Sequence, residues 1–336
     1  MIASPRSLRS AVANVTAKVL HGQVADLRRT PADQIGRVAG HPLFGYRSPD
    51  WLVPVGPPVL FVPSPGAPAR CFDLRRGGSL AEYVVGAGRL AYLLDHRPAV
   101  AGDPKELLTE WTLSVLPAAV RKVSRNADGQ PVQLVGWSLG GVLALLTAVD
   151  ATLPIASVAA IAPLLVPRRL RPADRLAGLE RALRRSYRTV TRIDDRDYLA
   201  QQEAVDRFHA AVEAHPGHEL VDACAALLAE ADLPGGEIVL ADRRLDLAKI
   251  KVPVLAVAGD RDPLAPPRAV RELTLALRSA QQVRFEIAPG DHLGVLTGRS
   301  ARETTWSHLD RWLDEGILRH GIRPQRHQTA ATGTDR

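Results

Sequence analysis

Ser138 stands in a sequence context that could make its hydroxyl a nucleophile. It is the centre of Gly-Trp-Ser-Leu-Gly at 136–140, between an apolar run at 132–135 and an apolar helical pattern at 142–149. A serine on a sharp strand-to-helix turn needs glycine two residues before and two residues after it, because the backbone there is strained and crowded. The alternative is a nucleotide-binding turn, but the segment lacks the GxGxxG spacing and the lysine of a P-loop. The pattern therefore predicts a nucleophilic serine.

A serine hydroxyl reacts well only when a base takes its proton, and His292 is the candidate base. Asp262 is the candidate to orient the imidazole, because it stands two residues before a Leu-Ala-Pro turn; Asp260, which directly ends an apolar run, is the competing carboxylate. Asp291 adjoins His292, and adjacent loop residues rarely face each other. His292 could also be an ordinary loop histidine. The order Ser, Asp, His along the chain is that of α/β-hydrolases.

Acyl chemistry also needs donors for the oxyanion that forms on the substrate carbonyl. The backbone N–H of Leu139, directly after the serine, is one candidate. The second should come from the loop at 62–67, which reads Val-Pro-Ser-Pro-Gly-Ala. Since proline has no N–H, the choice lies between Ser64 and Gly66, and we favour Ser64.

The elements that must position these residues are short apolar runs alternating with helix-length segments. Such runs are typical of buried parallel strands, and their repetition predicts a doubly wound α/β sheet. The expected strands are 59–62, 90–94, 132–135, 156–161, 254–257 and 283–287. The three reactive residues follow three of these strands, so parallel strands would bring them to one crevice.

Four regions follow from this pattern. Residues 1–45 are expected to be helical, with Val12, Val15, Val19, Leu20 and Val24 near helical spacing. The α/β-hydrolase core is expected at 46–166 and 251–316. The interval 167–250 breaks the rhythm, and an insertion of this kind predicts a helical cap over the carboxyl ends of the strands, with helices at 197–215 and 219–231. The polar, basic tail at 317–336 is expected to be disordered.

Composition sets broader limits. The 336 residues are 46% hydrophobic and 24% charged, which is close to the average for globular proteins. The net charge is +7, but no recognised nucleic-acid motif accompanies it, so no nucleic-acid partner is expected. No run approaches 18 apolar residues and no signal peptide is evident, so a spanning helix is not expected and only peripheral lipid contact is left open. Cys71 and Cys224 have no metal-site spacing and suit a reducing cytoplasm as buried thiols.

The wider sequence resembles the polyhydroxyalkanoate synthase branch of the α/β-hydrolase superfamily over about residues 55–315. The resemblance lies in Phe-Asp-Leu at 72–74, Asp-His-Arg-Pro at 95–98, the segments 240–247 and 259–266, and the surroundings of His292. These synthases use a cysteine nucleophile where this chain has Ser138. A serine ester is a less activated acyl donor than a cysteine thioester, which makes water the natural acceptor.

These observations predict a serine hydrolase of esters or thioesters with medium, long or 3-hydroxyacyl chains. Ser138, His292 and Asp262 would act through an acyl-enzyme, with no metal or organic cofactor. The substrate would be a small acyl ester or an acyl-CoA. An acyltransferase of the polyhydroxyalkanoate synthase type is the alternative, and a catalytically silent binding protein is the third. The arginine-rich stretch 168–196 is either a solvated face or a site for CoA phosphates or anionic lipid.

Overall fold

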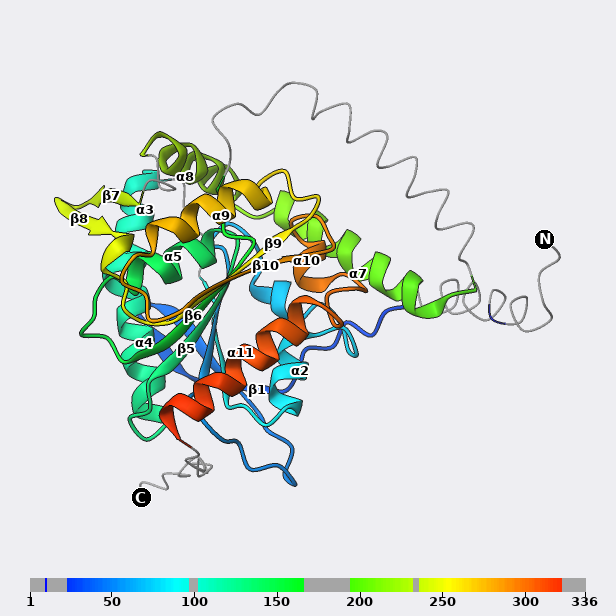
Figure 1. The fold of residues 1–336 in the computed structure, drawn as a ribbon. Helices are drawn as coiled ribbons and strands as arrows, with labels where there is room; N and C mark the ends of the chain where they lie inside the picture. Colours follow the sequence, from blue (N-terminus) through cyan, green and yellow to red (C-terminus); the bar gives the residue numbers. More distant parts are fainter. Residues whose placement is uncertain (1–9, 11–22, 97–101, 166–193, 232–235, 322–336) are drawn as a thin grey trace, which may run out of the picture.

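The protein folds around an eight-stranded sheet with the strand order β1-β2-β4-β3-β5-β6-β9-β10 (Figure 1). The structure is a computed structural model and describes residues 10, 23–96, 102–165, 194–231 and 236–321. Six strands run parallel, β2 runs antiparallel to them, and β1, which pairs antiparallel with β2, points the same way as the six. This is the α/β-hydrolase fold that the sequence predicts.

The parallel strands form where the apolar runs stand. Every residue of the four-residue strands β3 and β4 is buried, as is every residue of β5, β6 and β9, because helices cover both faces of the sheet. The last strand, β10, is at the sheet edge and is mostly exposed or half-buried. The bounds are β3 Val59–Val62, β4 Ala91–Leu94, β5 Val132–Trp137, β6 Ile155–Ile161, β9 Val254–Gly259 and β10 Val283–Ala288.

Helices pack on the two faces of the sheet. On one face α2 and α11 lie side by side, with the ring of Tyr83 5.3 Å from that of Trp306, and α4, α5 and α9 cover the other face (Figure 1). A 3-10 helix, η1, follows the loop after β3, and a π-helical turn, η2, joins α3 to α4. The bounds are η1 Ala69–Phe72, α2 Leu80–Gly86, α3 Pro104–Glu110, η2 Trp111–Val115, α4 Leu116–Asn126, α5 Leu139–Thr147, α9 Pro267–Ala276, α10 Gly294–Thr297 and α11 Thr305–His320.

The prediction of a helical segment over 1–45 is wrong in its last third. Residues Ala32–Val38 and His41–Tyr46 form the antiparallel strands β1 and β2, and β2 pairs with β4. The helical spacing that suggested otherwise falls mainly at 11–22, outside the described residues. A polar, half-exposed edge hairpin carries a weak hydrophobic pattern, and its strands are stabilised by pairing with β4, far along the chain.

The interval predicted as a helical cap contains the two expected helices, α7 (Arg196–Glu213) and α8 (His218–Glu230). It also contains a hairpin of β7 (Glu237–Leu240) and β8 (Arg243–Asp246), followed by the short helix η5 (Leu247–Lys249). The turn residues Ala241 and Asp242 both have positive φ, as a type I′ hairpin requires. The arginine-rich stretch lies largely at 166–193, outside the described residues.

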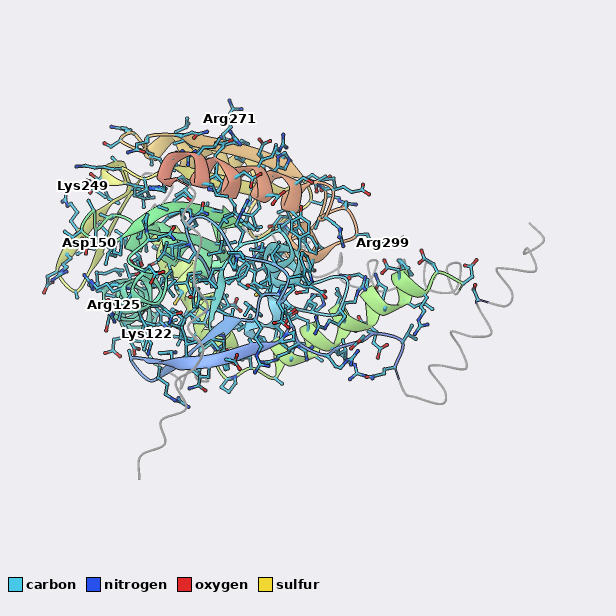
Figure 2. The ribbon with its side chains drawn as sticks, turned by 90° about the horizontal axis from the view of Figure 1, so that it is seen from below. Lys122, Arg125, Asp150, Lys249, Arg271 and Arg299 are labelled. Carbon is cyan, nitrogen blue, oxygen red and sulfur yellow. The ribbon has the colours of Figure 1, made fainter. Side chains whose placement is uncertain are left out.

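Side-chain hydrogen bonds attach α7 to the core. The buried Arg75 donates from Nε to Gln201 Oε1 at 2.9 Å, and Gln201 Nε2 donates to the carbonyl of Thr297 at 2.7 Å. Arg299 Nη1 donates to Asp195 Oδ2, the N-cap residue of α7, at 2.6 Å. Figure 2 places Arg299 beside α7, across the molecule from a group of charged side chains: Lys122, Arg125, Asp150 and Lys249. These hydrogen bonds hold α7 against the core of the protein.

The end of the chain also differs from the expected tail. Residues 317–320 belong to α11, where Arg319 pairs with Glu315 one turn earlier and stacks on the ring of Trp312. The remainder of the predicted tail, from 322, lies outside the described residues. Among the residues that the structure does describe, no helix has the length and apolar composition needed to cross a bilayer.

Candidate active site

Ser138 lies on a sharp turn between β5 and α5. Its backbone has φ 57° and ψ −130°, a region that costs a non-glycine residue about 1–3 kcal/mol. A Cβ at Gly136 would be 2.5 Å from the carbonyl oxygen of Gly140, and one at Gly140 would be 2.1 Å from the carbonyl oxygen of Val62. Both glycines are therefore required by close backbone approach, for the reason that the sequence pattern suggests.

The structure brings His292 and Asp262 to this turn. His292 Nε2 lies 2.8 Å from Ser138 Oγ, and His292 Nδ1 lies 2.8 Å from Asp262 Oδ2. The Asp262 side chain is fully buried, and its other oxygen accepts the backbone N–H groups of Leu264 and Ala265 at 2.9 and 3.0 Å. Hydroxyl, imidazole and carboxylate thus form one connected line of hydrogen bonds.

The two other nearby aspartates have different partners. Asp260 Oδ1 accepts the backbone N–H of Gly290 at 2.8 Å, and this bond holds the pKa of Asp260 below its usual range. Asp291 Oδ1 accepts the N–H of Gly294 at 2.7 Å. Both carboxylates therefore shape the loop that carries His292, and Asp262 is the one that contacts the imidazole.

The candidate oxyanion donors lie on both sides of Ser138. Leu139 is the first residue of α5, so its N–H has no acceptor within the helix. Ser64 is buried beside the same pocket, and its carbonyl accepts the N–H of Ala67 at 3.0 Å. Gly66 packs against the start of α8, where an added Cβ would come within 2.5 Å of the carbonyl oxygen of Gly217. The choice of Ser64 over Gly66 as the second donor stays a prediction.

A pocket of about 310 Å³ opens above Ser138. Most of its side chains are apolar, and they come from the core and from both cap helices. They are Trp137, Leu164, Phe208, Val212, Val221, Pro263, Leu264 and Leu293. Asp222 and Asp291 are exposed and lie at its mouth, and His209 also lines it. No lysine or arginine is found among the described residues of this lining.

Trp137 is a functional candidate that the sequence reasoning missed. Its indole Nε1 donates to the backbone carbonyl of His292 at 2.9 Å, and its ring centroid lies 5.2 Å from that of His292 and 6.1 Å from that of Phe208. Its place next to Ser138 was the only available signal. His96, which sequence reasoning leaves as structural or exposed, is buried, and its Nε2 lies 2.5 Å from the carbonyl oxygen of Ala67, at the end of the candidate oxyanion loop.

No competing reactive centre is evident near the pocket. Cys71 and Cys224 are both buried and free, and neither lines the pocket. Burial raises the pKa of the Cys224 thiol to about 12 and raises that of Cys71 well above its usual range. Within the described part of the chain, no group of three or more histidine, cysteine, aspartate and glutamate side chains could hold a metal ion.

Comparison with known proteins agrees with this geometry. The family model described as "Serine aminopeptidase, S33" matches residues 74–292. No curated protein matches the sequence.

Solved structures match the fold over most of the chain. The N-formylmaleamic acid deformylase of Pseudomonas putida S16 is 14% identical, with 83% of this chain and 99% of that chain covered and a TM-score of 0.53. The esterase of Thermogutta terrifontis is 16% identical, with 86% and 99% covered and a TM-score of 0.50. A membrane phospholipase A is 16% identical, with 92% and 93% covered and a TM-score of 0.50. None of these three is a polyhydroxyalkanoate synthase, so that narrower resemblance stays a prediction.

Proposed function

Because the chain belongs to the serine aminopeptidase S33 family of α/β-hydrolases, and so is a serine-dependent hydrolase, we propose that it cleaves uncharged carboxylic esters through an acyl-enzyme. The observation that carries the proposal is the unbroken line from Ser138 Oγ through His292 to Asp262, with 2.8 Å at each step. An attacking hydroxyl, its base and the base's orienting group need this arrangement.

The first half of the reaction forms the acyl-enzyme. Ser138 Oγ attacks the ester carbonyl while its proton passes to His292 Nε2, and the carbonyl electron pair moves onto oxygen. Asp262 accepts the Nδ1–H, which fixes the tautomer that leaves Nε2 free to receive a proton, and then stabilises the imidazolium. The N–H groups of Leu139 and Ser64 are the proposed donors to the oxyanion.

The acyl-enzyme forms when the tetrahedral intermediate collapses: the C–O bond to the alcohol breaks, and His292 gives its proton to the leaving oxygen. The second half releases the acid. Water then takes the alcohol's place, with His292 removing its proton as it attacks the acyl carbon. The second tetrahedral intermediate then collapses: the bond between the acyl carbon and Ser138 Oγ breaks, His292 returns its proton to Oγ, and the free acid leaves.

The pocket favours a small or medium apolar acyl group. Its wall is mainly aliphatic and aromatic, and its volume of about 310 Å³ is at the lower end of the range for small-molecule sites. The exposed carboxylates of Asp222 and Asp291 at its mouth would repel the phosphates of an acyl-CoA, and the described lining offers no cation to bind them. A neutral ester therefore suits this pocket better than a CoA thioester.

An activity panel separates these substrates. We expect p-nitrophenyl esters of short and medium chains to be hydrolysed, and 3-hydroxyacyl-CoA and aminoacyl p-nitroanilides of similar size to react far more slowly. Hydrolysis of the anilide as the best substrate would favour the aminopeptidase activity named by the family, and insoluble polyester from 3-hydroxyacyl-CoA would favour acyl transfer.

A fluorophosphonate probe tests the nucleophile itself. We expect it to label the wild type and not Ser138→Ala, with both proteins folded as judged by circular dichroism. Ser64→Ala, which keeps the backbone N–H, is the matched control and should still be labelled. Folded wild-type protein that takes up no probe would instead support a silent binding protein. A cytoplasmic location is also proposed, from the two free buried thiols, and fractionation of cells would test it.

A further inference from the structure

A second pocket, of about 260 Å³, lies between the β1–β2 hairpin and η1. It shares no lining residue with the pocket at Ser138. Apolar side chains line one part of it: Ala32, Phe44 and Leu93. The other part holds two arginines and a phenol, so this pocket combines an apolar wall with a group of hydrogen-bond donors.

The two arginines of this pocket are Arg29 and Arg70. Arg70 is half-buried, and its Nη2 donates to the backbone carbonyls of Leu27 and Leu74 at 2.6 and 3.3 Å. Arg29 is exposed, and among the described residues neither guanidinium forms an ion pair. Burial lowers the pKa of Arg70, and the positive charge of Arg29 lowers it further, so the two charges are close enough to repel.

One carboxylate, that of Asp73, also lines the pocket. It is buried, and both of its oxygens are occupied by Thr30: Oδ1 accepts the hydroxyl at 2.9 Å and Oδ2 accepts the backbone N–H at 2.7 Å. It offsets one positive charge and leaves a formal charge of about +1 on the lining, with unused N–H groups on both guanidiniums.

The phenol of Tyr46 adds a third donor. Tyr46 is only 5% exposed, and its ring packs edge-on against Phe61. Tyr46 lines the pocket together with the two arginines. Burial raises the pKa of Tyr46 well above its usual range, so the hydroxyl keeps its proton. A protonated phenol can donate a hydrogen bond to a ligand oxygen.

We propose that this pocket binds a small organic carboxylate with an apolar body. Arg29 and Arg70 would share the carboxylate, since guanidinium groups match carboxylate geometry with paired N–H donors. Tyr46 would donate to one of its oxygens. The body of the ligand would pack against Phe44 and Leu93, which a bare inorganic ion could not use.

Calorimetric titration of the full chain tests this site with three probes. Benzoate carries both features, benzyl alcohol has the ring without the charge, and inorganic phosphate has the charge without the ring. We expect benzoate to bind and the other two to bind at least about tenfold more weakly. Equal binding of benzyl alcohol would refute a role for the arginines, and equal binding of phosphate would refute the apolar half of the site.

Variants tie the binding to this pocket. Arg29→Gln and Tyr46→Phe should each weaken benzoate binding by about tenfold, the loss expected for one strong hydrogen bond. Arg28→Gln is the matched control, because Arg28 is exposed, pairs with Asp26 at 2.6 Å and lies outside the pocket lining. Unchanged affinity in Arg29→Gln or Tyr46→Phe would overturn the proposal. None of these residues lines the pocket at Ser138, so the result does not depend on the hydrolase activity.

Discussion

The indole of Trp137 is expected to hold His292 in place for catalysis, and Trp137→Phe tests this. The substitution keeps an aromatic ring beside His292 and Phe208 but removes the N–H that donates to the His292 carbonyl at 2.9 Å. The phenyl ring is also smaller than the indole, and the control variant described below undergoes the same loss of volume. The loss of that one bond should therefore appear in turnover more than in substrate binding.

The size of the effect follows from the bond. A net contribution of about 0.5–1.5 kcal/mol is typical for one intramolecular hydrogen bond. If the hydrogen bond stabilises the position of the imidazole beside Ser138, its loss raises the activation free energy of the reaction by the same amount. Since about 1.4 kcal/mol corresponds to a factor of ten, we expect kcat to fall by about two- to tenfold. KM should change by less than about twofold because the pocket keeps an aromatic wall.

Trp306→Phe is the matched control. The Trp306 indole donates to the carbonyl of Leu296 at 2.8 Å and is equally buried, but it does not contact His292. Both variants should lose about the same free energy of unfolding in urea, and only Trp137→Phe should lose turnover on a p-nitrophenyl ester, with active sites counted by the fluorophosphonate. Equal kcat values in the two variants would refute a positioning role for Trp137.

Three further predictions concern neighbouring groups. Asp262→Asn should lower kcat by about three to four orders of magnitude, because it disturbs the tautomer of His292, while Asp260→Asn should keep kcat within about tenfold of the wild type. Ester hydrolysis by the two variants measures this difference, and the reverse ranking would refute the assignment of Asp262 as the carboxylate that orients His292. The pKa of Asp260 is lower in the folded than in the unfolded protein, so its contribution to stability is present above the unfolded pKa and is lost as the pH falls through the folded pKa. In urea unfolding, Asp260→Asn should therefore lose less stability than the wild type on acidification. Equal losses in the two proteins would refute a stabilising role for the Asp260 carboxylate. Ser138→Gly should be more stable than Ser138→Ala by about 1 kcal/mol in urea, because glycine relieves the positive φ, and equal stabilities would mean that the turn is unstrained.

The candidate catalytic residues could be proposed from local sequence alone because each lies at a strand end with a recognisable turn. The turn around Ser138 requires glycine at 136 and 140, because a Cβ at either position would lie only 2.1–2.5 Å from a backbone carbonyl oxygen. The preference for Asp262 over Asp260 also rested on local information, the Leu-Ala-Pro turn, whose N–H groups hold the Asp262 carboxylate in the structure. Such features depend on neighbours within a few residues, so the sequence displays them.

The edge strands β1 and β2 and the hairpin of β7 and β8 could not be assigned in the same way. Their residues are half polar, and pairing with distant or later segments decides their conformation. The strong apolar runs of β3, β5, β6 and β9 were identified because complete burial leaves an unmistakable composition.

By itself, the sequence determined the candidate residues for the proposed chemistry: a serine turn, a histidine and a carboxylate in hydrolase order, on buried parallel strands. Only the tertiary structure decided which groups surround that chemistry, namely the indole of Trp137 on the histidine loop, the apolar wall from α7 and α8, and the separate arginine pocket beside β2. The physical reason is distance along the chain. A turn is fixed by adjacent backbone, whereas a pocket is made by side chains that come together only when remote elements pack.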